Sequence, residues 1–209
     1  MRHRFLGMIA LAAAAAAVPA GVRGQPAPRD TGLILSTPEA AIAAPVLRVR
    51  NMSLIVDLSE RTLFVMSGDE VVRRFPVSVG AEGYSTPAGS YRISHMIWNP
   101  RWVPPPSAWA RDHKPEPPGS PGNPMGRVKM FFREPDLYIH GTYLPSSLGN
   151  ARSHGCIRMR NIDAVELARI VMIHGGSDRP AAWYQQAVTV ADTSREVRLE
   201  TPVRLRIRA

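Results

Sequence analysis

The sequence predicts a mainly β fold, a β-sandwich or barrel-like mixed sheet with one or two short helices. Two observations support this class. The 209 residues include 20 prolines and 16 glycines, and long helical runs are few. From residue 51 onward, short segments alternate apolar and polar residues between turn-forming residues, as strands half-buried in a sheet do. With 44% hydrophobic and 21% charged residues, the composition is that of an ordinary soluble globular protein.

The strands are expected where the alternation is clearest. In the first one, Leu54, Val56 and Leu58 are separated by Ile55 and Asp57. A Ser-Gly-Asp-Glu turn then joins two further strands into a hairpin. The strands after the first are expected at 62–66, 71–79, 91–98, 128–132, 137–142, 157–159, 188–191 and 196–207.

One helix has clear start and stop signals. Asn161 is placed to cap its N-terminus, Asp163 and Glu166 suit the positive end of the helix dipole, and Gly175 with Gly176 ends it. A second, shorter helix is expected at 180–186, and a single helical turn near 38–44.

The chain divides into three parts. Residues 1–20 have a basic start, an alanine-rich apolar run and small residues at the end, which is the pattern of a secretory signal peptide. An uncleaved N-terminal anchor is the alternative. Residues 21–50 are expected to be a linker, and 51–209 a single domain. We therefore expect an exported protein of the cell envelope with no stable membrane span after signal cleavage.

The formal net charge of +9 suits an anionic partner or surface. The basic residues are scattered, and no nucleic-acid-binding motif is present, so nucleic acid is not the expected partner.

Residues 98–126 are rich in proline and glycine and cannot form a long regular element. Three tryptophans give this stretch something to pack with, so we expect an ordered cap over a functional site rather than a disordered spacer. Trp98 and Trp102 are its candidate contact residues.

Cys156 is the only cysteine of the chain. An exported protein usually pairs its cysteines, so a lone thiol is unusual there. A buried, inert cysteine is the common alternative, and the surrounding residues must decide between the two.

His140 ends a predicted strand, and a Gly/Ser/Asn-rich turn leads from there to Cys156. This topology can bring the two side chains together, so that the imidazole takes the thiol proton and later protonates a leaving amine. Arg158 and His154 would lower the thiol pKa further if they face it. The backbone N–H groups of Gly155 and Cys156 are candidates for an oxyanion hole.

These motifs resemble those of the bacterial L,D-transpeptidases with a YkuD-type catalytic domain, in particular the ErfK/YbiS-like members. The similarity covers about residues 51–174, and its pieces follow the family's order. The matching runs are Ile139-His140-Gly141-Thr142, Ser153-His154-Gly155-Cys156-Ile157-Arg158, Phe75-Pro76-Val77-Ser78-Val79-Gly80, Ser85-Thr86-Pro87-Ala88-Gly89, Trp98-Asn99-Pro100-Arg101-Trp102 and Asn123-Pro124-Met125-Gly126.

The resemblance implies a YkuD-like fold, a catalytic domain over 51–209 and an enzyme that needs no cofactor and no metal. It makes Cys156 the acylated nucleophile and His140 the proton acceptor and donor, with Ser153, His154, Gly155, Arg158 and Gly141 shaping the pocket. The expected substrates are peptidoglycan stem peptides, whose terminal D-alanine is released. The acyl acceptor is another stem peptide or an outer-membrane lipoprotein, and the expected location is the periplasm.

Three other functions remain open at this point. Water as the acceptor would give an L,D-carboxypeptidase or an enzyme that detaches lipoprotein from the wall. A catalytically silent wall-binding protein is the second. The third is a zinc site made of His140, His154 and Cys156, with His95 as a further ligand, although no carboxylate or second cysteine joins them. The segment after 175 is longer than the family's usual ending, which leaves the pairing of strands 188–207 open.

Overall fold

The computed structural model describes residues 37–209. The predicted signal segment 1–20, and residues 21–36 of the predicted linker, lie outside the described residues. The remainder is mostly β, with an almost barrel-like mixed sheet and, among the described residues, three α-helices, so the predicted fold class is confirmed.

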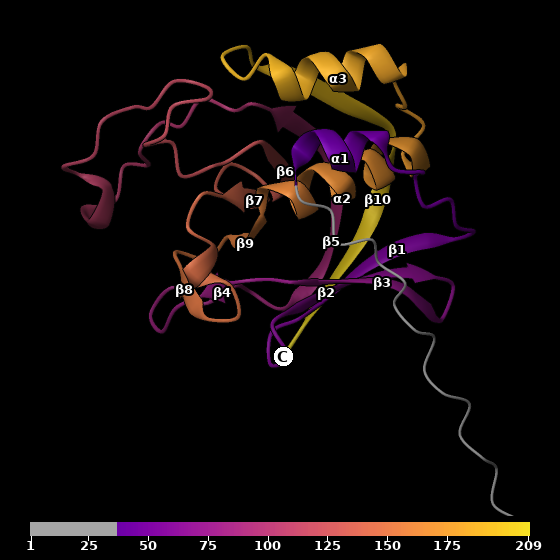
Figure 1. Cartoon of the computed structure of the whole chain (residues 1–209). Coiled ribbons are helices and arrows are strands. Elements are labelled where there is room, and N and C mark those ends of the chain that lie inside the picture. The colour runs from indigo at the N-terminus through magenta and orange to yellow at the C-terminus, as the bar shows by residue number, and fades with distance from the viewer. Residues whose placement is uncertain (1–36) are drawn as a thin grey trace, which may run out of the picture.

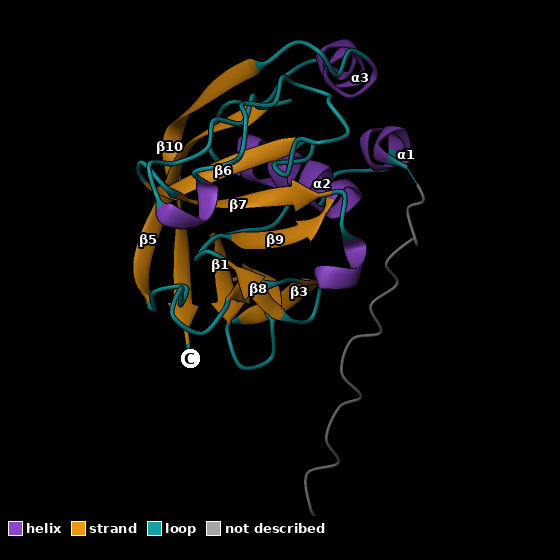
Figure 2. Cartoon of the chain, turned by 90° about the vertical axis from the view of Figure 1, so that its left-hand side faces the viewer, coloured by secondary structure: helices purple, strands orange, loops and turns teal. Residues whose placement is uncertain are grey.

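The main sheet has eight strands in the order β3-β2-β1-β10-β5-β6-β7-β9, and β4 pairs with β8 in a small second sheet. Figure 2 shows the strong curvature of the main sheet, with β5 and β10 on one side and β6, β7 and β9 beside one another. The strands are β1 (Met52–Asp57), β2 (Thr62–Ser67), β3 (Glu70–Pro76), β4 (Val79–Gly80), β5 (Gly89–Trp98), β6 (Val128–Arg133), β7 (Leu137–Thr142), β8 (Ala151–Ser153), β9 (Ile157–Arg160) and β10 (Arg195–Arg208).

The C-terminal strand completes the sheet. β10 pairs in parallel with β1 and antiparallel with β5, so it closes the gap between the N-terminal hairpins and the strands that follow. Its register shifts between Arg198 and Val203. The irregular part is fixed to the end of α2 (Asn161–His174), because the N–H of Thr201 donates to the carbonyl of Gly175.

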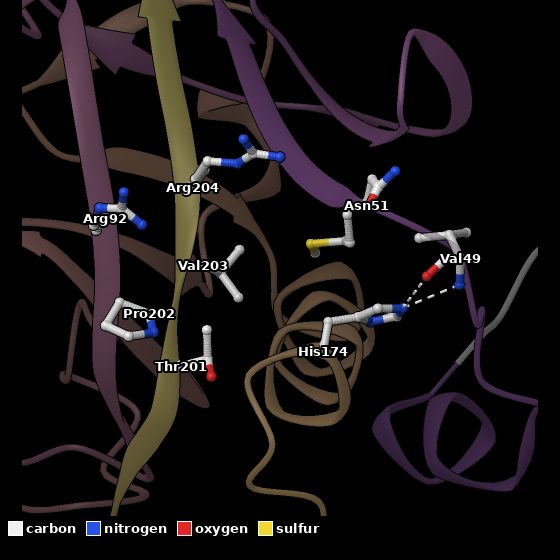
Figure 3. Close-up of a pocket in the computed structure, with 9 residues that line it drawn as sticks. Val49, Asn51, Arg92, His174, Thr201, Pro202, Val203 and Arg204 are labelled. Carbon is white, nitrogen blue, oxygen red and sulfur yellow. Dashed lines mark hydrogen bonds between the residues drawn. The ribbon is translucent and has the colours of Figure 1, made fainter.

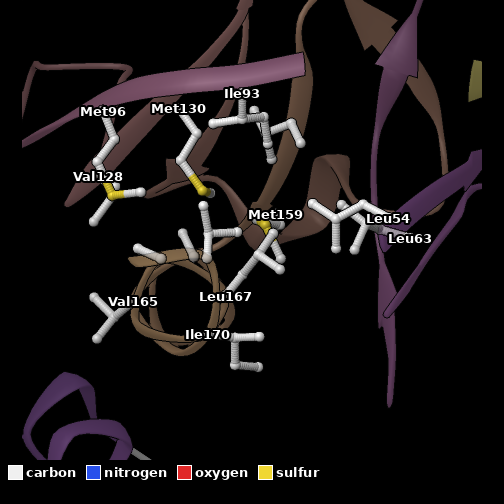
Figure 4. Packing of buried hydrophobic residues seen from close by; sticks show 14 of the residues in the cluster. Leu54, Leu63, Ile93, Met96, Val128, Met130, Met159, Val165, Leu167 and Ile170 are labelled. Carbon is white, nitrogen blue, oxygen red and sulfur yellow. The ribbon is translucent and has the colours of Figure 1, made fainter. Parts of the chain in front are cut away.

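The core lies between α2 and one face of the sheet (Figure 4). Strand residues such as Met130, Ile139 and Met159 and helix residues such as Val165 and Leu167 are fully buried there. Because side chains alternate along a strand, the neighbours of the buried strand residues point to the opposite face of the sheet. That opposite face carries the candidate site.

Three local predictions differ from the structure. Asn161 is the first residue of α2 rather than its N-cap, which is Arg160, and the Asn161 side chain is used elsewhere. Residues 188–191 do not form a strand, since Val188 and Thr189 belong to α3 (Ala181–Thr189). The predicted strand 71–79 is interrupted between β3 and β4.

The predicted linker also differs from what the structure shows. Within it, α1 (Pro38–Ala43) packs against α2 and α3, and its Ala41 and Ile42 are buried (Figure 1). Further along, the ring Nε2 of His174 lies 3.0 Å from the N of Val49. Residues 37–50 are therefore part of the folded unit.

None of the helices in the described part of the chain is long and apolar enough to cross a bilayer.

Candidate active site

The pairing of β7 with β9 brings the predicted catalytic residues to one face of the sheet. In the parallel pair β7–β9, Ile139 is opposite Ile157, and both are fully buried against the core. Alternation therefore directs Tyr138 and His140 of β7, and Cys156 just before β9, to the other face. His140 and Cys156 lie on adjacent strands, two positions apart along them, which is within the diagonal reach of side chains.

The Cys156 side chain is partly buried, and its Sγ lies 3.2 Å from the carbonyl oxygen of Asp136, to which the thiol donates. Burial raises the pKa of this thiol to about 11. Hydrogen bonds from Tyr138 and the positive charge of Arg158 lower the pKa, but they do not offset the burial.

His140 is almost fully buried, and its Nδ1 lies 2.7 Å from the carbonyl oxygen of Gly141. A carbonyl only accepts, so with the proton on Nδ1 toward Gly141 the neutral ring has its lone pair on Nε2. Burial lowers the His140 pKa to about 3, and the positive charges of Arg158 and Lys129 act in the same direction. The backbone hydrogen bond to Gly141 and a second one, to Met125, raise the His140 pKa but do not offset the burial.

The resting pair is thus a neutral thiol and a neutral imidazole, not the thiolate–imidazolium pair expected from the sequence. Arg158 shifts the thiol pKa in the expected direction, but loss of hydration is the larger effect. The imidazole remains able to accept a proton at neutral pH because it is unprotonated.

A serine holds the loop that presents the thiol. The Ser153 hydroxyl accepts a hydrogen bond from the N–H of Gly155 (3.2 Å) and donates to the carbonyl of Cys156. The N–H of Gly155 is therefore occupied, and the expectation that it serves in an oxyanion hole is wrong for this conformation. The N–H of Cys156 is left as the candidate of the two.

Gly155 has a structural reason to be glycine. Its φ is +102°, and a Cβ there would lie 3.1 Å from Cδ2 of Leu137. Thr86, from the loop before β5, fixes the same turn, since its hydroxyl donates to the carbonyl of Gly155 (3.0 Å) and accepts from the N–H of Gly80 (2.9 Å). The loop 84–86 and the cysteine loop thus hold each other in place.

Gly141 acts through packing. A Cβ on Gly141 would lie 2.2 Å from Oδ1 of Asn161, and one on Gly126 would lie 2.1 Å from the same atom. That oxygen accepts from the N–H of Arg127 at 3.0 Å. Asn161 therefore fastens the 123–127 segment beside His140, which is the role its side chain has instead of capping α2.

The structure separates the two tryptophans expected in the cap. Trp98 is the last residue of β5, is fully buried, and packs edge-on against Trp183 of α3, so it belongs to the core. Trp102 is also buried, and its backbone pairs with Glu116 inside the 99–127 loop. Trp109 is the tryptophan that reaches the site: its ring stacks on His154 at 3.8 Å.

His154 is exposed and lies between two rings, with Trp109 on its face and Tyr84 edge-on at 4.5 Å. Desolvation by these rings lowers its pKa, as does Arg158. His154 thus links the cap, the 84–86 loop and the cysteine loop.

The residues of the predicted zinc alternative do not gather. No group of three or more His, Cys, Asp or Glu side chains in residues 37–209 is arranged to hold a metal ion. His95 lies on β5, where it stacks on Phe131 at 4.3 Å.

The cavity shown in Figure 3 is not at this site. It has a volume of about 450 Å³ and lies where β1 begins, beside β10 and the end of α2, with Val49, Asn51 and His174 on one side and Arg92 and Arg204 on the other. It contains none of the candidate catalytic residues.

Residues 51–203 match the family model YkuD, the L,D-transpeptidase catalytic domain. The chain belongs to this family. Among curated L,D-transpeptidases, it is 35% identical to the putative L,D-transpeptidase YkuD of Bacillus licheniformis over 118 residues, which cover 56% of this chain and 59% of the relative. It is 30% identical to the probable L,D-transpeptidase ErfK/SrfK of Escherichia coli over 142 residues, or 64% and 44% of the two chains. The matched region thus spans about half the length of these relatives.

Solved structures of L,D-transpeptidases also resemble the chain. One from Mycobacterium smegmatis aligns with a TM-score of 0.47 at 18% identity, covering 76% of this chain and 58% of that one.

Within this L,D-transpeptidase domain, four residues near Cys156 and His140 were not among the predicted site residues: Lys129, Asp136, Tyr138 and Trp109. Tyr138 could have been found from the alternation in the predicted strand 137–142, because it lies two positions from His140. Asp136 contributes a backbone carbonyl, for which the sequence holds no signal.

Proposed function

We propose that the chain is an L,D-transpeptidase that acts on peptidoglycan stem peptides through an acyl-enzyme on Cys156. One observation carries the proposal: in a chain of this family, the only cysteine and a buried, neutral histidine face the same side of two adjacent strands. The family resemblance supplies the substrate class.

The acylation step can be written in full. The Cys156 sulfur attacks the carbonyl carbon of the third stem-peptide residue, and an S–C bond forms. The thiol proton passes to Nε2 of His140 and from there to the nitrogen of the terminal D-alanine as the C–N bond breaks. In the second step an acceptor amine attacks the thioester, a new C–N bond forms as the C–S bond breaks, and the amine proton passes through His140 to the sulfur.

The neutral resting pair suits a proton transfer coupled to attack. A free thiol with a pKa of about 11 holds its proton at neutral pH, but the sulfur loses its proton affinity as the S–C bond forms. His140 then accepts the proton at the moment it is released. The enzyme avoids storing a reactive thiolate, which would be open to oxidation in an exported protein.

Acylation is tested with a carbapenem, a class of drug that acylates this family, and intact-protein mass spectrometry. The wild-type chain should gain one adduct on the peptide that contains Cys156, and Cys156→Ala should gain none while its circular dichroism and melting temperature stay close to wild type. A folded wild-type protein that gains no adduct would favour the silent wall-binding alternative.

The acceptor is the second part of the proposal. We expect an amine, either of a second stem peptide, which gives a 3-3 cross-link, or of a lysine of an outer-membrane lipoprotein. Water would make the chain an L,D-carboxypeptidase or a detaching enzyme. Incubation with a disaccharide-tetrapeptide separates these reactions, because dimers indicate transfer and tripeptide alone indicates hydrolysis.

Such a substrate lies outside the cytoplasm, in agreement with the proposed export of the chain to the periplasm by the segment 1–20. N-terminal sequencing of the protein recovered from the envelope fraction tests this, and recovery only with the cytoplasm would contradict it.

A further inference from the structure

The ammonium group of Lys129 lies over two aromatic rings beside the candidate site. Lys129 of β6 is opposite His140 of β7, and Phe131 is opposite Tyr138. Paired residues point to the same face of a sheet, so Lys129 shares the face of Cys156 and His140. Its Nζ lies 4.8 Å from the centre of the Phe131 ring and 5.3 Å from that of the Tyr138 ring.

These two distances show which way the side chain leans. The Lys129 backbone is paired with His140, but its ammonium lies over the rings of the next pair on this face, Phe131 and Tyr138. Tyr138 in that pair is the neighbour of Cys156, to which it hydrogen-bonds. The ammonium and the sulfur thus both adjoin Tyr138, and the charge of a Cys156 thiolate acts on the Lys129 pKa.

The ammonium has no carboxylate partner within residues 37–209 at ion-pairing distance, although the Lys129 side chain is partly buried. A cation that loses hydration without gaining a counter-ion is unfavourable, and burial accordingly lowers the Lys129 pKa. Two aromatic faces offset part of this cost. A ligand carboxylate would offset the rest.

The charges around the sulfur favour an anionic ligand. Lys129 and Arg158 are the cations that act on His140, and both lower its pKa. Asp136 is the one acidic side chain among the groups that shift the pKa of Cys156. The described surroundings of the sulfur therefore hold two cations against one anion.

We propose that Lys129 forms a carboxylate-binding subsite that receives the C-terminal carboxylate of the residue released when Cys156 is acylated. The inference rests on the proposed function, which supplies that leaving residue. Its carboxylate is separated from the attacked carbonyl by one N–Cα unit, a span of about 3.5 Å. A substrate of that reach, with a charge-assisted hydrogen bond of about 2.8 Å, can engage the sulfur and the ammonium that adjoin the same tyrosine.

The subsite would couple binding to catalysis. A carboxylate at Lys129 cancels part of the positive charge that lowers the His140 pKa, so the histidine becomes a better base when the substrate is bound. With an uncharged peptide end, the full charge of Lys129 would keep the His140 pKa low, and the histidine would be a weaker base.

The kinetic test compares a tetrapeptide that ends in D-alanine with the same peptide ending in D-alaninamide. Wild type should have a kcat/KM for the acid about 10-fold or more above that for the amide, as expected of one charged hydrogen bond. Lys129→Met keeps the length and the apolar stem, and should abolish the preference, so that kcat/KM becomes equal for the acid and the amide. Lys129→Arg should restore most of the preference, and Arg206→Met, which removes an exposed charge of β10, should retain all of it.

Two kinetic results would overturn the subsite. One is an acid preference that survives in Lys129→Met. The other is an equal loss of rate on both peptides in that variant, which would show that Lys129 only supports the fold.

A binding test separates the subsite from the proposed reaction. Lys114 and Lys129 are the only lysines of the chain, so ¹³C-dimethylation of Cys156→Ala gives two lysine signals in NMR. The acid peptide should shift the Lys129 signal and not that of Lys114, and the amide should shift neither. If wild type released D-alanine from no peptide but this pattern held, the reaction would be wrong and the subsite right. A Lys129 shift that followed a carboxylate of the third residue instead would refute the assignment to the leaving residue.

Discussion

At the scale of single residues, the protonation states of the two reacting groups depend more on the loss of hydration than on nearby charges. Cys156 and His140 have pKa values displaced in opposite directions, to about 11 and about 3, and burial is the largest cause for both. The cations nearby would by themselves favour a thiolate. The balance is therefore set by how much water the cap and the strand pairing remove from the two groups.

The lowered pKa of His140 predicts a loss of stability in acid. The unfolded histidine titrates near 6.5 and the folded one near 3, so between these values the unfolded chain binds more protons. The contribution to stability is complete above pH 6.5 and is lost as the pH falls, with a slope of up to about 1.4 kcal/mol per pH unit. Urea unfolding from pH 7 to pH 4 should show this slope in wild type and a flatter curve in His140→Gln.

The control for this prediction is His113→Gln, which removes an exposed histidine of the 99–127 loop. It should keep the wild-type slope. Equal slopes in wild type and His140→Gln would mean that His140 titrates alike in the folded and unfolded chains.

The sequence was sufficient for the two reacting groups and insufficient for what surrounds them. Cys156 and His140 stand in recognisable motifs, and local spacing was enough to name them. Lys129 faces the site only because β6 pairs with β7 in one particular register. A one-residue shift would turn it away from the face of His140, and no single strand contains that information.

At the scale of elements, the strands followed their apolar alternation, while the end of α3 did not follow its local preference. Val188 and Thr189 are β-branched and favour a strand, yet Ala187 and Val188 are buried in α3. Asn99, just after β5, donates its side-chain N–H to the carbonyls of Ala187 (2.7 Å) and Val190 (3.1 Å). These tertiary contacts outweigh the propensity.

One ring of the 99–127 loop, that of Trp109, stacks on His154 of the cysteine loop, which gives a contrast between two tryptophans. Trp109→Leu removes the stack on His154 from a partly exposed position, so the free energy of unfolding should change by less than about 1 kcal/mol. The KM for the peptide substrate should rise several-fold, because His154 and the cysteine loop lose the aromatic ring that packs against them. Steady-state kinetics and urea unfolding measure both.

Trp98→Leu is the matched variant. Trp98 is fully buried against α3, so this change should cost about 2–4 kcal/mol of stability through the cavity it leaves. Similar stability losses in the two variants would show that Trp109 is also a core residue and would contradict the role given to the cap.

At the scale of the whole molecule, the catalytic unit is larger than its motifs. The family match begins at residue 51, but α1 packs on α2 and α3 ahead of it. Arg169 of α2 donates to the carbonyls of Ala41 and Ala44, and His174 at the end of the same helix holds Val49. A composition rich in alanine and proline suggested a linker, because short apolar runs carry little signal until their partner surface is known.

The docking of α1 leads to a prediction with a control on the same helix. Ala41 is 1% exposed, whereas Ala43, two positions on, is exposed. Ala41→Asp would bury a carboxylate without a partner and should lower the free energy of unfolding by about 2 kcal/mol or more. Ala43→Asp adds the same charge in water and should change it by less than about 0.5 kcal/mol. Because α2 supports the inner face of β7 and β6, Ala41→Asp should also slow acylation of Cys156 by a carbapenem at temperatures where the variant is still folded. Equal unfolding curves for the two variants would mean that residues 37–50 contribute nothing to the fold and that the domain starts at 51.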